Sequence, residues 1–169
     1  MHNPDGVIEV LLQPGDLYFG DRRTRIRTLL GSCVSLVLWH RGERIGGMCH
    51  YMLPSRRHPG SRLDGRYADE ALHLLLERIR ASGSQPQDYR ISLFGGGNMF
   101  GELCQRNIGQ SNVRAGLELL AAHGLKCHER HAGGDGYRNL IFDVCSGHIA
   151  LRCPTSQQIA TRRYEAPTP

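Results

Sequence analysis

A cysteine and a histidine between strand-forming segments are the residues of this chain best suited to covalent chemistry. Cys33 opens the run C-V-S-L-V-L-W-H, and His50 follows seventeen residues later within a second apolar run, Ile45 to Leu53. Two such runs joined by a short loop that contains glycine predict a β-hairpin. With the turn centred between Arg41 and Gly42, Cys33 lies directly opposite His50, at a Cβ separation of about 4.5–5.5 Å.

A cysteine nucleophile needs this proximity. A thiol with an ordinary pKa near ~8.5 is mostly neutral at physiological pH, whereas a neighbouring imidazolium stabilises the thiolate and can protonate a leaving group. Gly31 and Ser32 are small enough to leave N–H groups exposed toward a bound carbonyl, as an oxyanion hole requires. Thr28 is a candidate for the third residue, which orients the imidazole. The competing interpretation is inert packing, because cysteine is often fully buried.

The bulk properties predict an ordinary globular protein. The 169 residues predict a single domain, residues 1–169, with flexible ends at residues 1–6 and 154–169. Apolar residues make up 40% of the chain, and no run approaches the roughly 20 apolar residues that span a bilayer. The amino terminus lacks the pattern of a secretory signal, and the six cysteines form no C-x-x-C pair. We therefore expect a cytoplasmic protein with free thiols and no membrane insertion.

The remaining elements alternate between strands and helices. Helical periodicity predicts helices over Tyr67–Ser82 and Ser111–His123, and residues 54–65 between the hairpin and the first helix predict a loop that borders the site. Two helices and eight or nine short strands, mostly linked as hairpins, favour an α/β sandwich of antiparallel or mixed sheets with outer helices. The other predicted strands are 7–12, 17–20, 90–94, 125–131, 138–144 and 148–153.

Two further patterns favour structure over binding. Arginines are concentrated in residues 22–27, but the interleaved aromatic residues of a nucleic-acid site are missing, so we expect a solvated face and no nucleic-acid partner. Gly95, Gly96 and Gly97 follow a predicted strand without the lysine and serine or threonine of a phosphate-binding loop, which favours tight backbone curvature near the site. No spacing indicates a metal site.

Several segments in order resemble the chemoreceptor glutamine deamidases, the CheD family. Together they span about residues 8 to 153, which makes the resemblance far stronger than any single motif. The matching segments are T-L-L-G-S-C-V-S-L, G-G-M-C-H-Y-M-L-P, G-R-Y-A-D-E-A-L, F-G-G-G-N-M-F, N-I-G-Q-S-N-V and A-G-G-D-G-Y-R.

The resemblance implies roles for individual residues. It implies Cys33 as nucleophile and His50 as general acid and base. Some members have an extra glycine before L-G-S-C, so Thr28 stands one residue closer to the cysteine here. If a bulge absorbs the difference, Thr28 orients the imidazole; otherwise the relay is a dyad supported by the backbone.

The resemblance also implies fold and function. It implies a cysteine hydrolase fold of the toxin-deamidase type, without a cofactor, that converts glutamines on the cytoplasmic helices of chemotaxis receptors to glutamate. Hydrolysis of glutamate methyl esters by the same route is a further implied activity. The alternative function is a non-catalytic regulatory partner of a CheC-type phosphatase, and nucleic-acid binding ranks far below both.

Overall fold

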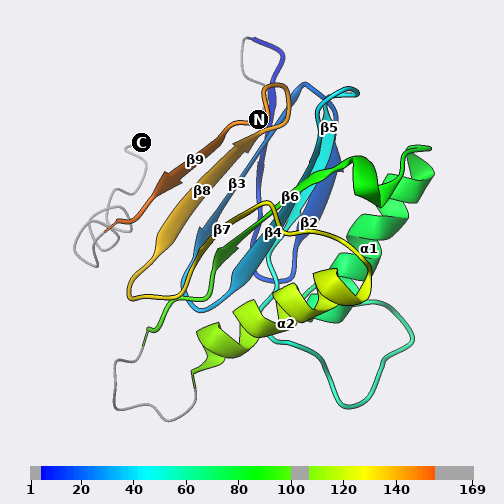
Figure 1. Ribbon diagram of the computed structural model, residues 1–169. Coiled ribbons are helices and arrows are strands. Elements are labelled where there is room, and N and C mark those ends of the chain that lie inside the picture. Colours follow the sequence, from blue (N-terminus) through cyan, green and yellow to red (C-terminus); the bar gives the residue numbers. More distant parts are fainter. Residues whose placement is uncertain (1–4, 100–106, 155–169) are drawn as a thin grey trace, which may run out of the picture.

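Two β-sheets and two α-helices make up the computed structural model, which describes residues 5–99 and 107–154 (Figure 1). The strands are β1 (Ile8–Leu11), β2 (Leu17–Gly20), β3 (Thr24–Leu30), β4 (Val34–His40), β5 (Ile45–Cys49), β6 (Arg90–Gly95), β7 (Glu129–Ala132), β8 (Arg138–Asp143) and β9 (Ile149–Arg152). The helices are α1 (Ala68–Ala81) and α2 (Ile108–Ala122), with a 3-10 turn, η1 (Pro86–Asp88), between α1 and β6.

The strands form one sheet of four, in the order β1-β3-β8-β9, and one of five, in the order β2-β5-β4-β6-β7. Strand β1 runs parallel to β3 and β6 parallel to β7, whereas the other pairs are antiparallel. Both helices lie on the same side of the five-stranded sheet (Figure 1). The predicted α/β sandwich of mixed sheets with outer helices is therefore confirmed, with both helices on one side.

Strand β4 occupies the centre of the five-stranded sheet, and its sequence explains why. The run V-S-L-V-L is buried without interruption, which is typical of a strand that is covered on both faces. Leu36 and Leu38 pack toward α1 and α2, and Val37 packs toward the four-stranded sheet. The core is therefore split into two layers by β4 and its neighbours.

Strand β3 shows the alternation of a sheet with one solvated face. Thr24, Ile26, Thr28 and Leu30 are buried, and the residues between them are exposed or half-buried. Outward-facing Arg25 forms ion pairs with acidic side chains of β1 and β8. The arginine-rich segment thus forms part of the outer face of the four-stranded sheet, as its sequence predicts.

The two helices differ in how well their limits were predicted. Helix α1 agrees with the expected range to one residue at each end, because its buried leucines and alanines repeat at helical spacing. Helix α2 begins three residues before the predicted Ser111, at Ile108, where the Asn107 side chain accepts a hydrogen bond from the Gln110 N–H at 2.9 Å. Gly109 in this first turn gave no helical signal.

Within residues 5–99 and 107–154, neither helix has the length and apolarity that a bilayer-spanning helix needs. The predicted flexible ends, residues 1–6 and 154–169, lie largely outside the described residues. The single-domain organisation stays a prediction.

Candidate functional site

Cys33 lies where the chain passes from the four-stranded sheet to the five-stranded sheet. Gly31, Ser32 and Cys33 connect β3 to β4, and the half-buried Cys33 side chain packs against the apolar layer between the sheets. Strand β3 belongs to one sheet and β4 to the other, so this short connection is confined on both sides. The thiol is therefore at the end of a strand, where the chain crosses between the sheets, rather than in the middle of the core.

Hydrogen bonds fix all three carbonyl groups of this connection. The Gly97 N–H donates to Gly31 O at 2.9 Å, and the Gly96 N–H donates to Cys33 O at 2.9 Å. The Asn112 side chain donates to Ser32 O at 3.1 Å. In the described residues, no hydrogen bond engages the N–H groups of Ser32 and Cys33. The peptide planes are thus held from one side, which leaves these two N–H groups available to an acceptor.

The glycine triplet curves the backbone behind this connection. Gly95 has φ of 115° and Gly96 has φ of 68°, a region that favours glycine. A Cβ atom on Gly96 would collide with Val113 in α2, and one on Gly97 would come within 2.6 Å of the Gly136 carbonyl oxygen. The predicted tight curvature near the site is confirmed, and it brings the N–H groups of Gly96 and Gly97 to the carbonyls of the Cys33 connection.

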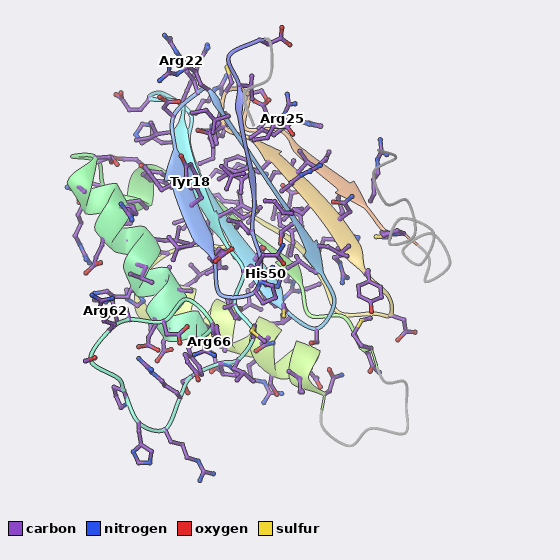
Figure 2. All side chains as sticks on the ribbon, turned by 180° about the vertical axis from the view of Figure 1, so that it is seen from behind. Tyr18, Arg22, Arg25, His50, Arg62 and Arg66 are labelled. Carbon is purple, nitrogen blue, oxygen red and sulfur yellow. The ribbon has the colours of Figure 1, made fainter. Side chains whose placement is uncertain are left out.

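His50 lies one residue beyond β5 and is only 3% exposed. Its backbone is held by the turn that precedes β2: the His50 N–H donates to Asp16 O at 3.0 Å, and the Gly15 N–H donates to His50 O at 2.7 Å. Figure 2 shows His50 at the end of the sheets where the loop carrying Arg62 and Arg66 projects. Backbone pairing and burial therefore fix the position of the imidazole.

Thr28 contacts His50 across the two sheets. Thr28 Oγ1 lies 2.9 Å from the Leu12 carbonyl oxygen and 2.8 Å from His50 Nδ1. A hydroxyl has one proton and a carbonyl oxygen can only accept, so the hydroxyl donates to Leu12 and accepts from Nδ1–H. The neutral imidazole therefore holds its proton on Nδ1 and has a lone pair on Nε2, which is the form that a general base requires.

The predicted pairing of Cys33 with His50 is wrong, because the register is shifted by two residues. His40 pairs with Ile45, and Val34 forms a bridge with Tyr51, so the turn contains four residues and His50 falls opposite Ser35. Cys33 and His50 still lie on the same face, as diagonal neighbours, for which the spacing is about 7–8 Å. The longer turn has a physical reason, since the His40 ring accepts the Glu43 N–H at 3.1 Å.

The structure brings together all the residues singled out in the sequence. Thr28, Cys33 and His50 lie at one end of the layer between the sheets, with Gly31 and Ser32 beside the thiol. No hydrogen bond joins the Cys33 thiol to the imidazole among the described residues. Catalytic hydrogen bonds are often long before substrate binds, so this separation is compatible with proton transfer in a complex.

Burial controls the electrostatics of the pair. It raises the pKa of the Cys33 thiol above its ordinary value. It also lowers the pKa of His50 from 6.5 to about 4, although the negative charge of Asp16 acts in the opposite direction. Both shifts favour the neutral forms at pH 7, and so oppose the preformed thiolate–imidazolium pair that the sequence suggested.

Two residues near the site were not singled out in the sequence, although Asn112 lies in the matching segment N-I-G-Q-S-N-V. Asn112 of α2 is fully buried, and its side-chain amide donates to Ser32 O at 3.1 Å and to Met52 O at 2.7 Å. It therefore joins the segments that carry the thiol and the imidazole. Asp16 supports the imidazole through its backbone and its charge. Only the tertiary structure brings these residues to the site.

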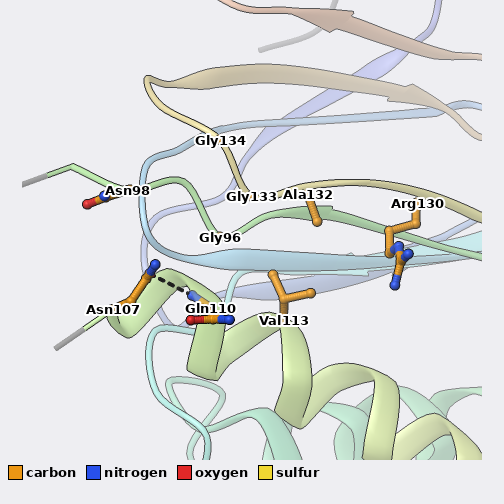
Figure 3. A pocket seen from close by; sticks show the side chains of 9 residues that line it. All are labelled: Gly96, Asn98, Asn107, Gln110, Val113, Arg130, Ala132, Gly133 and Gly134. Carbon is orange, nitrogen blue, oxygen red and sulfur yellow. Dashed lines mark hydrogen bonds between the residues drawn. The ribbon is translucent and has the colours of Figure 1, made fainter. Parts of the chain in front are cut away.

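A separate pocket lies on the helix side of the five-stranded sheet. Its volume is about 370 Å³, and it is lined by residues of α2, the glycine triplet, β7 and the segment after β7, including Gln110, Arg130 and Gly133 (Figure 3). Neither Cys33 nor His50 lines it. The Gly96 N–H donates to the Cys33 carbonyl oxygen, so the pocket adjoins the Cys33 connection only through the glycine triplet and shares no lining residue with the thiol or the imidazole.

A cysteine, a histidine and a threonine gathered at the end of a two-sheet α/β fold is an arrangement suited to a cysteine-dependent hydrolase. Residues 52–153 match the family described as "CheD chemotactic sensory transduction". The chain is also similar to proteins of this family over about nine-tenths of its length. It belongs to the CheD family.

Two relatives illustrate this similarity. The "Probable chemoreceptor glutamine deamidase CheD" of Pseudomonas savastanoi pv. phaseolicola is 47% identical, over 90% of this chain and 88% of the relative. The "Probable chemoreceptor glutamine deamidase CheD 3" of Dechloromonas aromatica is 49% identical, over 89% and 91%. Among solved structures, the hypothetical protein YfiH of Bacillus licheniformis matches 69% of this chain and 50% of its own, at 15% identity and a TM-score of 0.47.

Proposed function

We propose that this chain is a protein-glutamine deamidase, which hydrolyses the side-chain carboxamide of glutamines on chemotaxis receptors to glutamate. The contact between Thr28 Oγ1 and His50 Nδ1, at 2.8 Å, carries the proposal because it leaves Nε2 free as a base on the face that Cys33 shares. The names of the relatives support the same chemistry and a receptor substrate.

The first half of the reaction transfers the acyl group to sulfur. Cys33 Sγ attacks the carboxamide carbon while its proton passes to His50 Nε2, so the ions form during attack and need not exist beforehand. The N–H groups of Ser32 and Cys33 donate to the oxyanion, helped by the small Gly31. The imidazolium then protonates the amide nitrogen, the C–N bond breaks, and ammonia leaves behind a thioester.

The second half uses water and restores the enzyme. His50 Nε2 takes a proton from water as its oxygen attacks the thioester carbon. The C–S bond breaks, the thiol regains its proton, and glutamate is released. Thr28 keeps the imidazole oriented through both halves by accepting from Nδ1–H, an interaction that strengthens when the ring is charged. The balance is glutamine plus water to glutamate plus ammonium, because ammonia takes up the proton of the new carboxylic acid, and no cofactor takes part.

Three finer points belong to the same proposal. A glutamate methyl ester would react by the same route, with methanol as leaving group. The cytoplasmic helices of the receptor are the substrate surface, and a cytoplasmic location suits the cysteines, which are free wherever the structure describes them. A CheC-type phosphatase is the regulatory partner that we expect from the family resemblance.

Ammonia release from a receptor cytoplasmic fragment tests the proposal. The protein should release ammonia and convert particular glutamines to glutamate, which mass spectrometry locates. Cys33→Ala and His50→Ala should lose turnover while they keep the circular dichroism of the folded protein. If Cys33→Ala deamidates at the unchanged rate, the proposed function is contradicted. If Cys33→Ala loses turnover but still binds a CheC-type partner, docking is separate from catalysis.

A further inference from the structure

An arginine-rich loop borders the candidate site, and its positive charges outnumber its negative charges. Residues 54–66 contain four arginines and one acidic residue, Asp64. The Met52 N–H donates to Arg66 O at 2.8 Å, and the Leu53 N–H donates to Arg66 O at 3.1 Å. The base of the loop is therefore closed two residues after His50.

Internal contacts hold the loop in place. Arg56 Nη2 lies 2.7 Å from Glu70 Oε1 and 2.7 Å from the Arg62 carbonyl oxygen, and its guanidinium lies over the Tyr67 ring. Arg66 forms an ion pair with Asp64 at 2.6 Å. Two of the four arginines thus neutralise the nearby carboxylates of Glu70 and Asp64, which leaves the outer part of the loop without acidic partners.

Two unpaired arginines and one exposed leucine belong to this loop, and a second exposed leucine lies at its base. Arg57 and Arg62 are exposed and form no ion pair with any described residue. Leu53 and Leu63 are each 42% exposed, although large apolar side chains are usually covered. Figure 2 places Arg62 on the projecting loop and Arg66 between it and His50. Positive and apolar groups therefore occur together on one side of the candidate site.

We propose that this surface, made of Leu53, Arg57, Arg62 and Leu63, is the substrate-docking surface for an acidic polypeptide segment that flanks the target glutamine. The proposal rests on the proposed function and adds the chemistry by which the substrate is selected. Carboxylates of the segment pair with the two arginines, and its apolar side chains cover the two leucines. A segment docked here lies at the same end of the molecule as His50, because the base of the loop is bonded two residues after His50 and the loop projects at that end (Figure 2).

Charge complementarity selects this surface over Arg22 and Arg25 of the arginine-rich segment 22–27. Arg25 is already paired with Glu9 at 3.3 Å and with Asp143 at 3.4 Å, so it contributes little free charge. Arg22 is exposed, but it lies at the opposite end of the molecule from His50 (Figure 2). Rim charges mainly change association rates and their dependence on salt, and are suited to steering a substrate rather than to the chemical step.

Paired charge reversals test the docking surface. Arg57→Glu with Arg62→Glu is compared with Arg22→Glu with Arg41→Glu, which changes the net charge equally but places it far from the site. With a receptor cytoplasmic fragment at low salt, we expect the loop pair to lower kcat/KM for ammonia release about tenfold, mostly through KM, and the distal pair to stay within about twofold. Added salt should reduce the difference.

A second arm follows binding without turnover. In the Cys33→Ala background, the loop reversals should weaken binding of the same fragment. A fragment with alanines in place of the acidic residues near its glutamine should bind the loop variant and the distal variant equally. The proposal would be overturned if both pairs of reversals lowered binding and kcat/KM equally, or if neither pair lowered them. Loss of duplex DNA binding with unchanged deamidation would also overturn it, and would assign the loop to nucleic acid.

These results separate the docking surface from the proposed function. A parent protein that releases no ammonia from the fragment contradicts the deamidase, whereas the binding arm still measures docking. If the parent protein deamidates the fragment but the Arg57→Glu, Arg62→Glu variant behaves like the distal variant, only the docking surface is contradicted.

Discussion

The two faces of the five-stranded sheet carry very different side chains, although consecutive residues of the same strands supply both. The face toward α1 and α2 is a continuous apolar layer, in which the hydroxyl of Tyr51 is satisfied by the Asn112 carbonyl at 2.6 Å. The face toward the four-stranded sheet is apolar in its middle but ends in Ser35, His50 and the facing Thr28, all buried. The candidate chemistry is confined to that end.

Two cysteines show what this difference means. Cys49 and His50 are neighbours in sequence, yet Cys49 faces the helices, is fully buried, and has a pKa raised by burial to about 12. Cys33 lies on the other face at the end of a strand and is half-buried. Burial keeps the Cys49 thiol neutral and away from substrate, whereas Cys33 combines partial exposure with a histidine on the same face.

Exchanging each cysteine for alanine is the strongest test of this contrast. We expect Cys33→Ala to lower kcat for ammonia release by about 10⁴-fold or more, because the nucleophile is lost. Cys49→Ala should keep kcat per folded molecule and lose about 1–3 kcal/mol of unfolding free energy in urea. Equal activity losses in the two folded variants would show that the two faces do not differ in function.

His50 provides the next largest effect. His50→Gln removes the general base while keeping a polar side chain of similar reach, and we expect kcat to fall about 10²- to 10⁴-fold. His40, which ends β4 at the other end of the hairpin, is the control: His40→Gln should stay within about threefold, because its ring contacts the local turn and Tyr89 and not the candidate site. Comparable losses from the two substitutions in steady-state assays would contradict the assigned role.

The sequence predicted the elements well and their contacts less well. Periodicity located α1 and the β4–β5 hairpin, because burial patterns there follow local spacing, whereas β3 was not among the predicted strands. The pairing of Cys33 with His50 failed because it depended on the number of residues in the turn, which the His40 ring contact increases. One residue of error in the centre of a turn shifts a cross-strand partner by two.

The site shows the same division. Cys33, His50 and Thr28 were identified from their types and from the family resemblance, and Thr28 reaches Nδ1 although β3 pairs with β8 without a bulge. Asn112 lies within a matching segment, but its role and that of Asp16 were missed because both roles depend on backbone atoms far away in the sequence. Motifs reveal reacting groups more readily than the residues that position them.

The buried imidazole predicts a dependence of stability on pH. The unfolded chain binds a proton at His50 near pH 6.5, but the folded protein does so only near pH 4, so protons favour the unfolded chain between these values. The free energy of unfolding attributable to His50 should therefore fall by about 3 kcal/mol as the pH drops from 6.5 to 4. Urea unfolding of the parent protein against His50→Gln isolates this contribution, and parallel pH curves would contradict it.

Thr28 tests whether the polar contact between the sheets serves catalysis. Thr28→Val keeps the shape of the side chain but removes the acceptor for Nδ1–H, and we expect kcat to fall about 10- to 100-fold, as for lost partners of catalytic histidines. Thr28→Ser keeps the hydroxyl and should stay within a few-fold of the parent. If valine and serine give the same steady-state rates, the hydroxyl is only part of the packing between the sheets.

Substitution of Asp16 has the smallest expected effect, and it tests the charge that acts on His50 at the polar end of the sheet face. Its negative charge raises the pKa of His50 against the effect of burial, and its Oδ2 accepts the Gln13 N–H at 2.9 Å. Asp16→Asn keeps an acceptor for the turn but removes the charge, so the pKa of His50 should fall further. NMR titration of the imidazole should show this downward shift, and the acid limb of the kcat/KM profile should move the same way. Asp16→Ala, which also removes the turn acceptor, should lose stability in addition, whereas an unmoved titration in Asp16→Asn would assign Asp16 to the turn alone.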